Sequence, residues 1–501
     1  MRKNGFNRFV WAAIIVLSTG IWSACNNAST SSSSALASSD GGKIPITTTS
    51  EEARKEFLQG RDLAEKLLAQ DSLQHFDKAL ALDPQFAYAE LARANASATT
   101  NEFFEHEKKS VALADKASEP ERLLILAAQA GTNGDVSKQK EYLGKLVAAC
   151  PNDERAQFAL ATYHFGQQEY DPAIEHYKKA TELAPGYSPS YNLLGYAYRQ
   201  QDNYAAAEQA FQKYIELIPN DPNPYDSYAE LLLKMGRFDE SIAQYRKALS
   251  IDPHFVPSHF GISADLMYQG KAADAEAELE KMSHEARNDG ELRTAYFGLA
   301  VVASDSGKLE KATQQMDREY AVAEKKNDLA SMAADLQAKG NIIAQMQKYD
   351  EAQKQFDRSL QLIESSSLTQ EIKDNAKLLH HFNLAALAID KKDYATAQSH
   401  AEEFRQGAEA SKNSVQIKQS HELAGRIALA QKDYDKAIAE LAQANLQNPQ
   451  NLYRLAQSYQ AKGDTAKAKE YCTKAANFNS LPALPYAFVR TKAKQWASKK
   501  A

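Results

Sequence analysis

The sequence has little cysteine and little tryptophan, with three of each in 501 residues. So few cysteines argue against the disulfide framework that stabilises small secreted domains. No strand-length segment alternates cleanly between apolar and polar residues, which argues against a β-sheet. The formal net charge is −6, and apart from a short C-terminal group the basic residues are dispersed. Because nucleic acids call for a clustered basic face, we predict no nucleic-acid partner.

Residue patterns for metal binding are also missing. His284 and His421 are each followed by a glutamate, as in zinc proteases, but neither has a second histidine four residues later. His380 and His381 are adjacent, so on a helix they point about 100° apart and cannot jointly hold one ion. We therefore predict no metal site.

Motifs for other chemistry are incomplete. The segment from Gly261 to Asp265 lacks the second glycine of a nucleophile elbow. Gly270 and Gly307 each precede a lysine, but a phosphate-binding loop needs a glycine five residues earlier and a Ser or Thr after the lysine. We predict no catalytic residues, no cofactor and no enzyme activity.

A strict period is present instead. Prolines recur every 34 residues, at Pro151, Pro185, Pro219 and Pro253. Proline cannot sit inside a helical turn, so each one marks the end of a helix. A fixed period of this length is typical of a stacked helical repeat.

Each period also carries a polar turn, an aromatic and a small residue, as in Gln168–Ala173 and Lys432–Ala437. About twelve residues before that small residue stands another, on the preceding helix. Two small residues facing each other allow the backbones of an antiparallel helix pair to approach closely. The earlier small residues are Ala161, Gly195, Ala229, Ser263, Gly340, Ala385, Gly425 and Ala456.

These landmarks resemble the tetratricopeptide repeat. Residues 191–219 read YNLLGYAYRQQDNYAAAEQAFQKYIELIP, close to the family consensus, and the resemblance runs from about Ala53 to Ser480. It implies an all-α fold, a right-handed α-solenoid of about twelve helix-turn-helix units. We expect first helices to start near Ala53, Ala87, Pro120, Glu154, Ser188, Pro222, Val256, Arg293, Ala333, Leu378, Lys418 and Pro449.

The repeats divide into a regular and a less regular array. We predict an N-terminal array over 50–284, a C-terminal array over 285–482 and a capping helix over 483–501. Spacings lengthen after Val256, and we expect loops at Ala286–Gly290 and Ser365–Ser367 to take up the extra residues. Thr49 and Glu52 are predicted to form a capping box for the first helix.

The N-terminus reads as an export signal. Arg2, Lys3 and Arg8 precede an apolar run, and residues 1–24 have the layout of a signal peptide. Ser23-Ala24-Cys25 resembles a bacterial lipobox, which implies lipidation at Cys25 and localisation in the cell envelope, as an outer-membrane lipoprotein facing the periplasm. Trp22 departs from the usual aliphatic residue. Cleavage after Ala37 to give a soluble secreted protein is the alternative.

The segment between the signal and the repeats has no helical periodicity. Residues 25–49 are rich in Ser, Ala and Asn and are predicted to form a flexible tether. Removing the signal takes away three basic residues and changes the net charge from −6 to −9. Cys150 and Cys472 are expected to be buried free thiols.

The resemblance also implies where a partner binds. In this family the first helices line a concave groove that holds a peptide or a partner helix. The implied groove residues here are Phe158, Thr162, Phe165, Asn192, Tyr196, Arg199, Asp226, Glu230, Leu233, Phe260 and Met267. Aromatic residues beside Arg and Asn are typical of an interface hot spot.

Two functions follow from this pattern. The first is a non-enzymatic interaction scaffold or adaptor that binds a protein or peptide partner and contacts the membrane only through its lipid. The alternative is a glycan-binding lipoprotein of an outer-membrane uptake system, although sugar platforms favour tryptophan and only Trp496 follows the signal and tether. The oligomeric state stays open.

Overall fold

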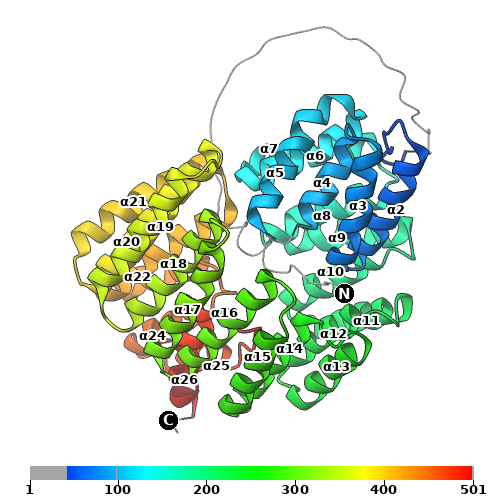
Figure 1. Cartoon of the computed structure of the whole chain (residues 1–501). Coiled ribbons are helices and arrows are strands. Elements are labelled where there is room, and N and C mark those ends of the chain that lie inside the picture. Colours follow the sequence, from blue (N-terminus) through cyan, green and yellow to red (C-terminus); the bar gives the residue numbers. More distant parts are fainter. Residues whose placement is uncertain (1–41, 98, 499–501) are drawn as a thin grey trace. The chain divides into compact units, whose positions relative to one another are not determined.

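The computed structural model describes residues 42–97 and 99–498, and the regular structure in these ranges is helical throughout (Figure 1). The export signal, Cys25 and the tether up to residue 41 lie outside the described residues. Contacts divide the described chain into two units, one of residues 42–224 and 369–372 and one of residues 225–368 and 373–498. The predicted division after residue 284 falls inside the second unit.

The first unit consists of helices that pack in consecutive pairs. They are α2 (Glu51–Glu65), α3 (Ala69–Leu82), α4 (Ala87–Asn95), α5 (Thr100–Leu113), the short η1 (Ala114–Lys116), α6 (Glu119–Asn133), α7 (Val136–Ala149), α8 (Glu154–Gly166), α9 (Tyr170–Leu183), α10 (Ser188–Gln200) and α11 (Tyr204–Leu217). The division between the units lies in α12 (Pro222–Lys234).

The second unit continues the pairing with longer helices. They are α13 (Phe238–Ile251), α14 (Val256–Tyr268), α15 (Ala272–Glu285), α16 (Asp289–Asp305), α17 (Leu309–Glu324), α18 (Leu329–Gln345), α19 (Tyr349–Ser365), α20 (Gln370–Asp390), α21 (Tyr394–Ser411), α22 (Ser414–Ala430), α23 (Tyr434–Gln443), α24 (Pro449–Ala461), α25 (Thr465–Ala476) and α26 (Leu484–Ala497). Even-numbered helices up to α24 are the first helices of their pairs. The predicted all-α, paired-helix fold is confirmed.

The periodic prolines lie between pairs, as expected. Pro151, for example, stands between α7 and α8. Within a pair, the turn has a residue in the left-handed region two positions after the first helix, such as Gln168 (φ 59°) or Gly236 (φ 76°). This conformation lets the following amides bond back to carbonyls of the helix end, as from Glu169 N to His164 O at 2.9 Å. The recurring turn therefore sets the spacing from one helix to the next.

Small residues do mark the helix crossings. All eight predicted positions are buried. A Cβ atom added at Gly195 would lie 2.7 Å from the ring of Phe211, and one at Gly340 would lie 2.5 Å from that of Phe356. In these pairs an aromatic ring of the second helix occupies the space that a side chain on the first helix would need. The crossing therefore depends on the missing side chain.

Two local predictions were wrong. The extra length after residue 285 is taken up by helices of 16 to 21 residues, such as α17 and α20, in place of the 13 or 14 of α8 to α15. The intervening loops stay short.

At the first helix, Ser50 is the N-cap and accepts from Ala53 N at 3.1 Å, whereas Thr49 bonds to Asp83. A capping box forms instead at Ser118 and Glu121 of α6.

The two described cysteines are buried free thiols, which confirms the prediction. Cys150 is 2% exposed and Cys472 1% exposed. Burial raises the pKa of both thiols. Cys472 Sγ lies 3.4 Å from the carbonyl oxygen of Ala493 in α26. Both sulfurs therefore serve as core atoms.

We predict that Gly195→Leu lowers the free energy of unfolding by about 1–3 kcal/mol, because the new side chain must displace the Phe211 ring. Chemical denaturation followed by circular dichroism measures the change. Gly144→Leu is the matched control, because Gly144 is a helical glycine with no atom within 4 Å of an added Cβ. Equal stability of the two variants would contradict the assigned crossing.

Candidate functional site

An extended segment of the first unit, residues 43–49, lies against the starts of α6 and α8 and against the end of α3. We call this segment the strap. Carboxylates of successive repeats accept hydrogen bonds from its backbone. Ile44 N donates to Asp153 Oδ2 at 2.9 Å, and Thr47 N donates to Glu121 Oε1 at 2.8 Å. Thr49 N donates to Asp83 Oδ2 at 3.0 Å.

Side chains of the strap alternate as in an extended peptide. Ile46 is 7% exposed and packs in a cluster with Phe57, Phe76 and Phe86. Ile44 packs against the next cluster, which contains Leu143 and Leu146. Backbone bonds and alternate apolar side chains together hold the segment. Residues 43–49, assigned to the tether from sequence, therefore belong to the folded unit.

The electrostatics of the strap favour ionised carboxylates. Burial raises the pKa of Asp83, but hydrogen bonds from Thr48, Thr49 and Gln85 outweigh it and hold that pKa below its ordinary value. Thr48 Oγ1 donates to Asp83 Oδ2 at 2.6 Å. At the other end, Lys43 forms an ion pair with Glu154. Negatively charged carboxylates, Asp83 at one end and Glu154 at the other, therefore bind the strap.

A second ion pair links repeats beside the strap. Arg155 of α8 binds Glu65 of α2 through two bonds, Nε to Oε1 at 2.6 Å and Nη2 to Oε2 at 3.0 Å. Its guanidinium also lies 5.1 Å from the ring centre of Tyr187. Burial opposes the charged form of Arg155, but the bond to Glu65 raises its pKa overall. This bidentate pair fixes helices that are 90 residues apart in sequence.

We predict that Asp83→Ala loosens the strap, because Thr49 N and Thr48 Oγ1 lose their acceptor. A cost of about 1–2 kcal/mol for the lost bonds corresponds to roughly 5- to 30-fold faster exchange of the amide of Thr49, measured by hydrogen–deuterium exchange. Glu52→Ala, on the exposed side of α2, is the control.

Acid should have the same effect in the unaltered chain. The folded pKa of Asp83 lies below its ordinary value, so its contribution is complete above about pH 4 and is lost as the pH falls through the folded pKa. Protection factors at the strap, which correct for the intrinsic pH dependence of amide exchange, would contradict the assigned role of this carboxylate if they were independent of both Asp83 and pH.

The groove residues of the first unit are only partly accessible. Phe158, Thr162, Phe165 and Arg199 are half-buried, whereas Asn192 and Tyr196 are buried. Phe158 lies 5.6 Å from the ring of Tyr187. These side chains come from α8 and α10, as predicted.

Specific contacts hold three members of this set: Tyr196, Arg199 and Thr162. The guanidinium of Arg199 lies 4.6 Å from the ring centre of Tyr196, which in turn packs edge-on against Phe211 at 5.2 Å. Thr162 Oγ1 donates to the carbonyl oxygen of Phe158 at 2.8 Å. Among the described residues, Asn192 Oδ1 is buried without a hydrogen-bond partner. Tyr196 therefore packs against Phe211, the ring that occupies the helix crossing, and positions Arg199 beside it.

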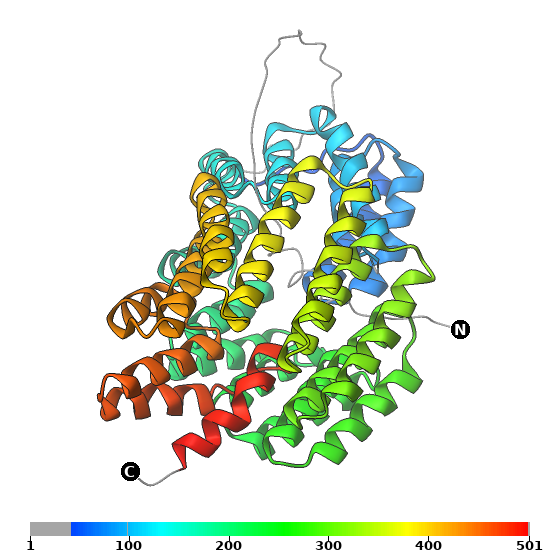
Figure 2. The same cartoon turned by 90° about the vertical axis from the view of Figure 1, so that its left-hand side faces the viewer.

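The groove residues of the second unit lie in the core. Leu233, Phe260 and Met267 are 1–3% exposed and form one hydrophobic cluster that includes Tyr486 and Val489 of α26. The position of α26 beside α16 and α25 can be followed in Figures 1 and 2. These three residues therefore do not offer a surface to a partner, because they are buried in the hydrophobic core of the second unit.

The two acidic groove residues, Asp226 and Glu230, are buried as well. Asp226 Oδ1 accepts from Ser258 Oγ at 3.0 Å, which links α12 to α14.

Polar contacts fix α26 against the first helices of its unit. Arg490 forms an ion pair with Asp305 at the end of α16. Just before the helix, Lys234 Nζ donates to the carbonyl oxygen of Phe478 at 2.8 Å and lies 3.9 Å from its ring centre. The sequence signal for this contact was available, since Tyr486, Val489 and Ala493 fall on one helical face with Arg490 beside them.

Buried carboxyl groups are present away from the strap. Burial raises the pKa of Glu107 to about 7 and that of Asp265 to about 8. Glu107 accepts from Thr132 Oγ1. Arg293 binds Asp335 through bonds of 2.7 and 2.8 Å. Beside Asp335 is a cavity of only about 90 Å³.

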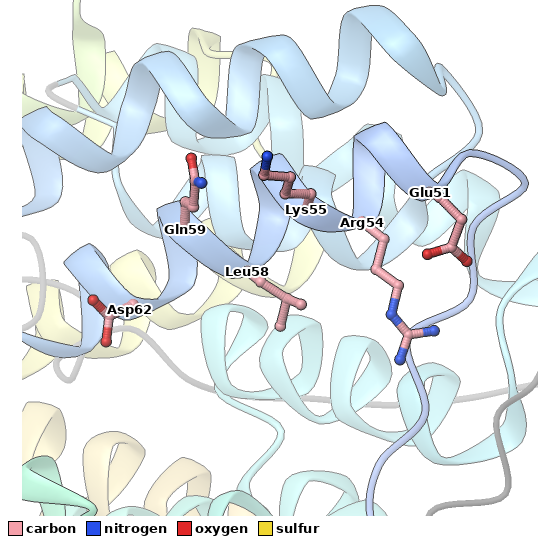
Figure 3. A pocket seen from close by; sticks show the side chains of 6 residues that line it. All are labelled: Glu51, Arg54, Lys55, Leu58, Gln59 and Asp62. Atoms are coloured by element: carbon pink, nitrogen blue, oxygen red, sulfur yellow. The ribbon is translucent and has the colours of Figure 1, made fainter.

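A surface hollow of about 450 Å³ is lined by Glu51, Arg54, Lys55, Leu58, Gln59 and Asp62. All six side chains come from one helix, α2, as Figure 3 shows. A binding site with convergent groups needs side chains from several elements. Within residues 42–97 and 99–498, no helix has both the length and the apolar character needed to cross a membrane.

Comparison with known families identifies the repeat. Residues 158–222 match one sequence model of the tetratricopeptide repeat, and residues 223–255 and 449–480 match another. The chain therefore contains tetratricopeptide repeats, which supports the predicted resemblance. Such repeats generally mediate protein–protein interactions.

Curated relatives are similar over parts of the chain. The mouse Superkiller complex protein 3 is 27% identical over 111 residues, which cover 22% of this chain and 7% of that protein. The Dictyostelium discoideum homologue of DnaJ homolog subfamily C member 7 is 24% identical, covering 32% and 36%. The TPR repeat-containing protein YpiA of Bacillus subtilis is 22% identical, covering 51% and 65%. The chain thus spans less than two thirds of each relative.

Solved structures with similar helical arrays include MamA, 24% identical with a TM-score of 0.28, covering 32% of this chain and 89% of that one. A tetratricopeptide repeat protein from Parabacteroides merdae is 17% identical with a TM-score of 0.36, covering 55% and 94%.

Proposed function

We propose, from the tetratricopeptide repeats that the chain carries, that it is a non-enzymatic scaffold of the bacterial cell envelope that binds an extended segment of a partner protein. The binding surface is the first-helix face of α8 and α10. Its accessible members are Phe158, Thr162, Phe165 and Arg199, with Tyr196 supporting the guanidinium from below.

The strap is the observation that carries this proposal. It is an extended peptide held by carboxylates of successive repeats and by alternate isoleucine side chains. Extended peptides bind well where main-chain bonds supply affinity and side-chain pockets supply specificity. The repeats of the first unit therefore have the chemistry to bind such a segment.

The chemistry of the proposed surface favours a particular partner. Half-buried aromatic rings supply apolar area, and one guanidinium can form a bidentate bond with a carboxylate. A peptide with an acidic side chain near apolar residues fits this set. Trp496, the tryptophan available for a sugar platform, packs edge-on against Tyr453 at 5.6 Å, so the described structure adds no support for glycan binding.

Site-specific photocrosslinking in the native envelope tests the binding surface. A photoreactive residue in place of Phe165 should give a discrete adduct with a partner. Arg199→Glu in the same chain should remove most of this adduct, because the substitution replaces a positive side chain with a negative one. Gln212, on the exposed side of α11, is the control position. Equal adducts from residues 165 and 212, or an adduct unaffected by Arg199→Glu, would place the binding surface elsewhere.

The envelope location is proposed from the lipobox at Cys25. The sequence predicts a Ser-rich tether between this cysteine and the repeats, and it lies outside the described residues. The repeats would then lie clear of the lipid headgroups.

We predict that Cys25→Ser moves the protein from the membrane fraction to the soluble fraction, because a serine cannot form the thioether. Fractionation and mass spectrometry of the N-terminus measure the change, and Cys150→Ser is the control for loss of a buried thiol. Continued membrane association of the Cys25→Ser protein would exclude the lipid anchor.

A further inference from the structure

We propose that His381, His400 and Glu403 form a binding site for a divalent transition-metal ion such as Zn²⁺. One possible ligand atom from each residue lies within 4.8 Å of the others. His381 comes from α20, and His400 and Glu403 come from α21, three residues apart and so on one helical face. The site lies entirely within the second unit.

The distances are close to those of a metal site. Nδ1 of His381 and Nδ1 of His400 are 3.0 Å apart, and Nε2 of His381 lies 3.3 Å from Glu403 Oε2. Two imidazole nitrogens bound to one tetrahedral Zn²⁺ at about 2.0–2.1 Å are separated by roughly 3.3 Å. His400 faces Nδ1 of His381 and Glu403 faces Nε2, so the three groups can share one ion only if the carboxylate of Glu403, 55% exposed, turns toward the nitrogen that His381 offers.

The same position in other repeats shows what is unusual here. In four other helix pairs, residues 19 apart form a cross-helix contact between one histidine and one acceptor side chain. These pairs are Glu56–His75, Gln157–His176, His259–Glu278 and His421–Glu440. In each of them, an oxygen can accept the proton of the histidine Nδ1. The pair His381–His400 has the same spacing, but here the Nδ1 atom of one imidazole lies opposite the Nδ1 atom of another.

Within the described residues, the neighbouring charged side chains form contacts among themselves and not with His381, His400 or Glu403. His380 faces away to Asp357, with Nε2 and Oδ1 3.3 Å apart. Glu402 and Glu409 bind Arg405.

The donor set indicates the class of ion. Two imidazoles and one carboxylate suit Zn²⁺, Cu²⁺ or Ni²⁺, whereas Mg²⁺ prefers oxygen ligands. Three protein ligands leave at least one coordination position of Zn²⁺ open to water. The ion would bridge α20 and α21. This proposal departs from the prediction of no metal site made from the sequence, which considered His381 only with its neighbour His380 and not with residues of α21.

Isothermal titration of the untagged full chain with ZnCl2 tests the site, with MgCl2 as the comparison ion. We expect one saturable Zn²⁺ site per chain, tighter than any Mg²⁺ binding. His381→Gln should abolish it, and Glu403→Gln should weaken it at least tenfold. His381→Gln reproduces the Gln157–His176 pair found in this chain, so the fold should tolerate it; circular dichroism checks this.

His421→Ala is the matched control, because His421 has the same position in its repeat but faces Glu440. It should bind Zn²⁺ as the unaltered chain does. The Cu²⁺-loaded chain should show two nitrogen ligands by electron paramagnetic resonance. Zn²⁺ binding no tighter than Mg²⁺ binding, equal binding by the folded His381→Gln protein, or equal weakening by His421→Ala would overturn the proposal.

Discussion

The close crossing of the two helices in each pair is the constraint on which the rest of the structure depends. A glycine on the first helix leaves room for an aromatic or leucine side chain of the second helix, as where Gly195 meets Phe211 and Gly425 meets Leu441. This contact fixes the rotation of each helix about its axis, because only one face can approach so closely. Which side chains point toward a partner, toward the strap or toward another repeat follows from that rotation.

Both units use segments of their own chain where repeats of this kind could bind a partner. In the first unit the strap is extended and is held at the helix starts by carboxylates. In the second unit α26 is a helix whose Tyr486 and Val489 join the main hydrophobic cluster. The two cases show that stacked helix pairs accept an extended peptide at their ends and an amphipathic helix against their first helices. They also leave α8 and α10 as the part of the predicted groove with accessible side chains.

The sequence predicted the starts of the first helices correctly where prolines and turn residues recur at a fixed spacing. The observed starts of α8, α10, α12 and α14 are the predicted residues, because prolines and turn residues recur at fixed positions. The first helices α16, α18, α20 and α22 begin four to eight residues before the predicted positions, because longer helices keep the same crossing while their ends shift, whereas α24 begins at the predicted Pro449. Contacts between segments that are far apart in the chain do not give rise to a repeating pattern in the sequence. The burial of Leu233 and Phe260 in a cluster that also contains residues of α26, and the contact of Thr49 with Asp83, therefore needed the structure.

The strap has a mechanical consequence. Its bonds go to Asp153 at the start of α8, to Glu121 of α6 and to Asp83 at the end of α3, and the chain enters α2 only after the last of them. A pulling force applied to the residues before 42 would reach these bonds before it reached the first turn of α2. An anchor attached ahead of the strap would thus pull on the body of the first unit and spare its terminal helix.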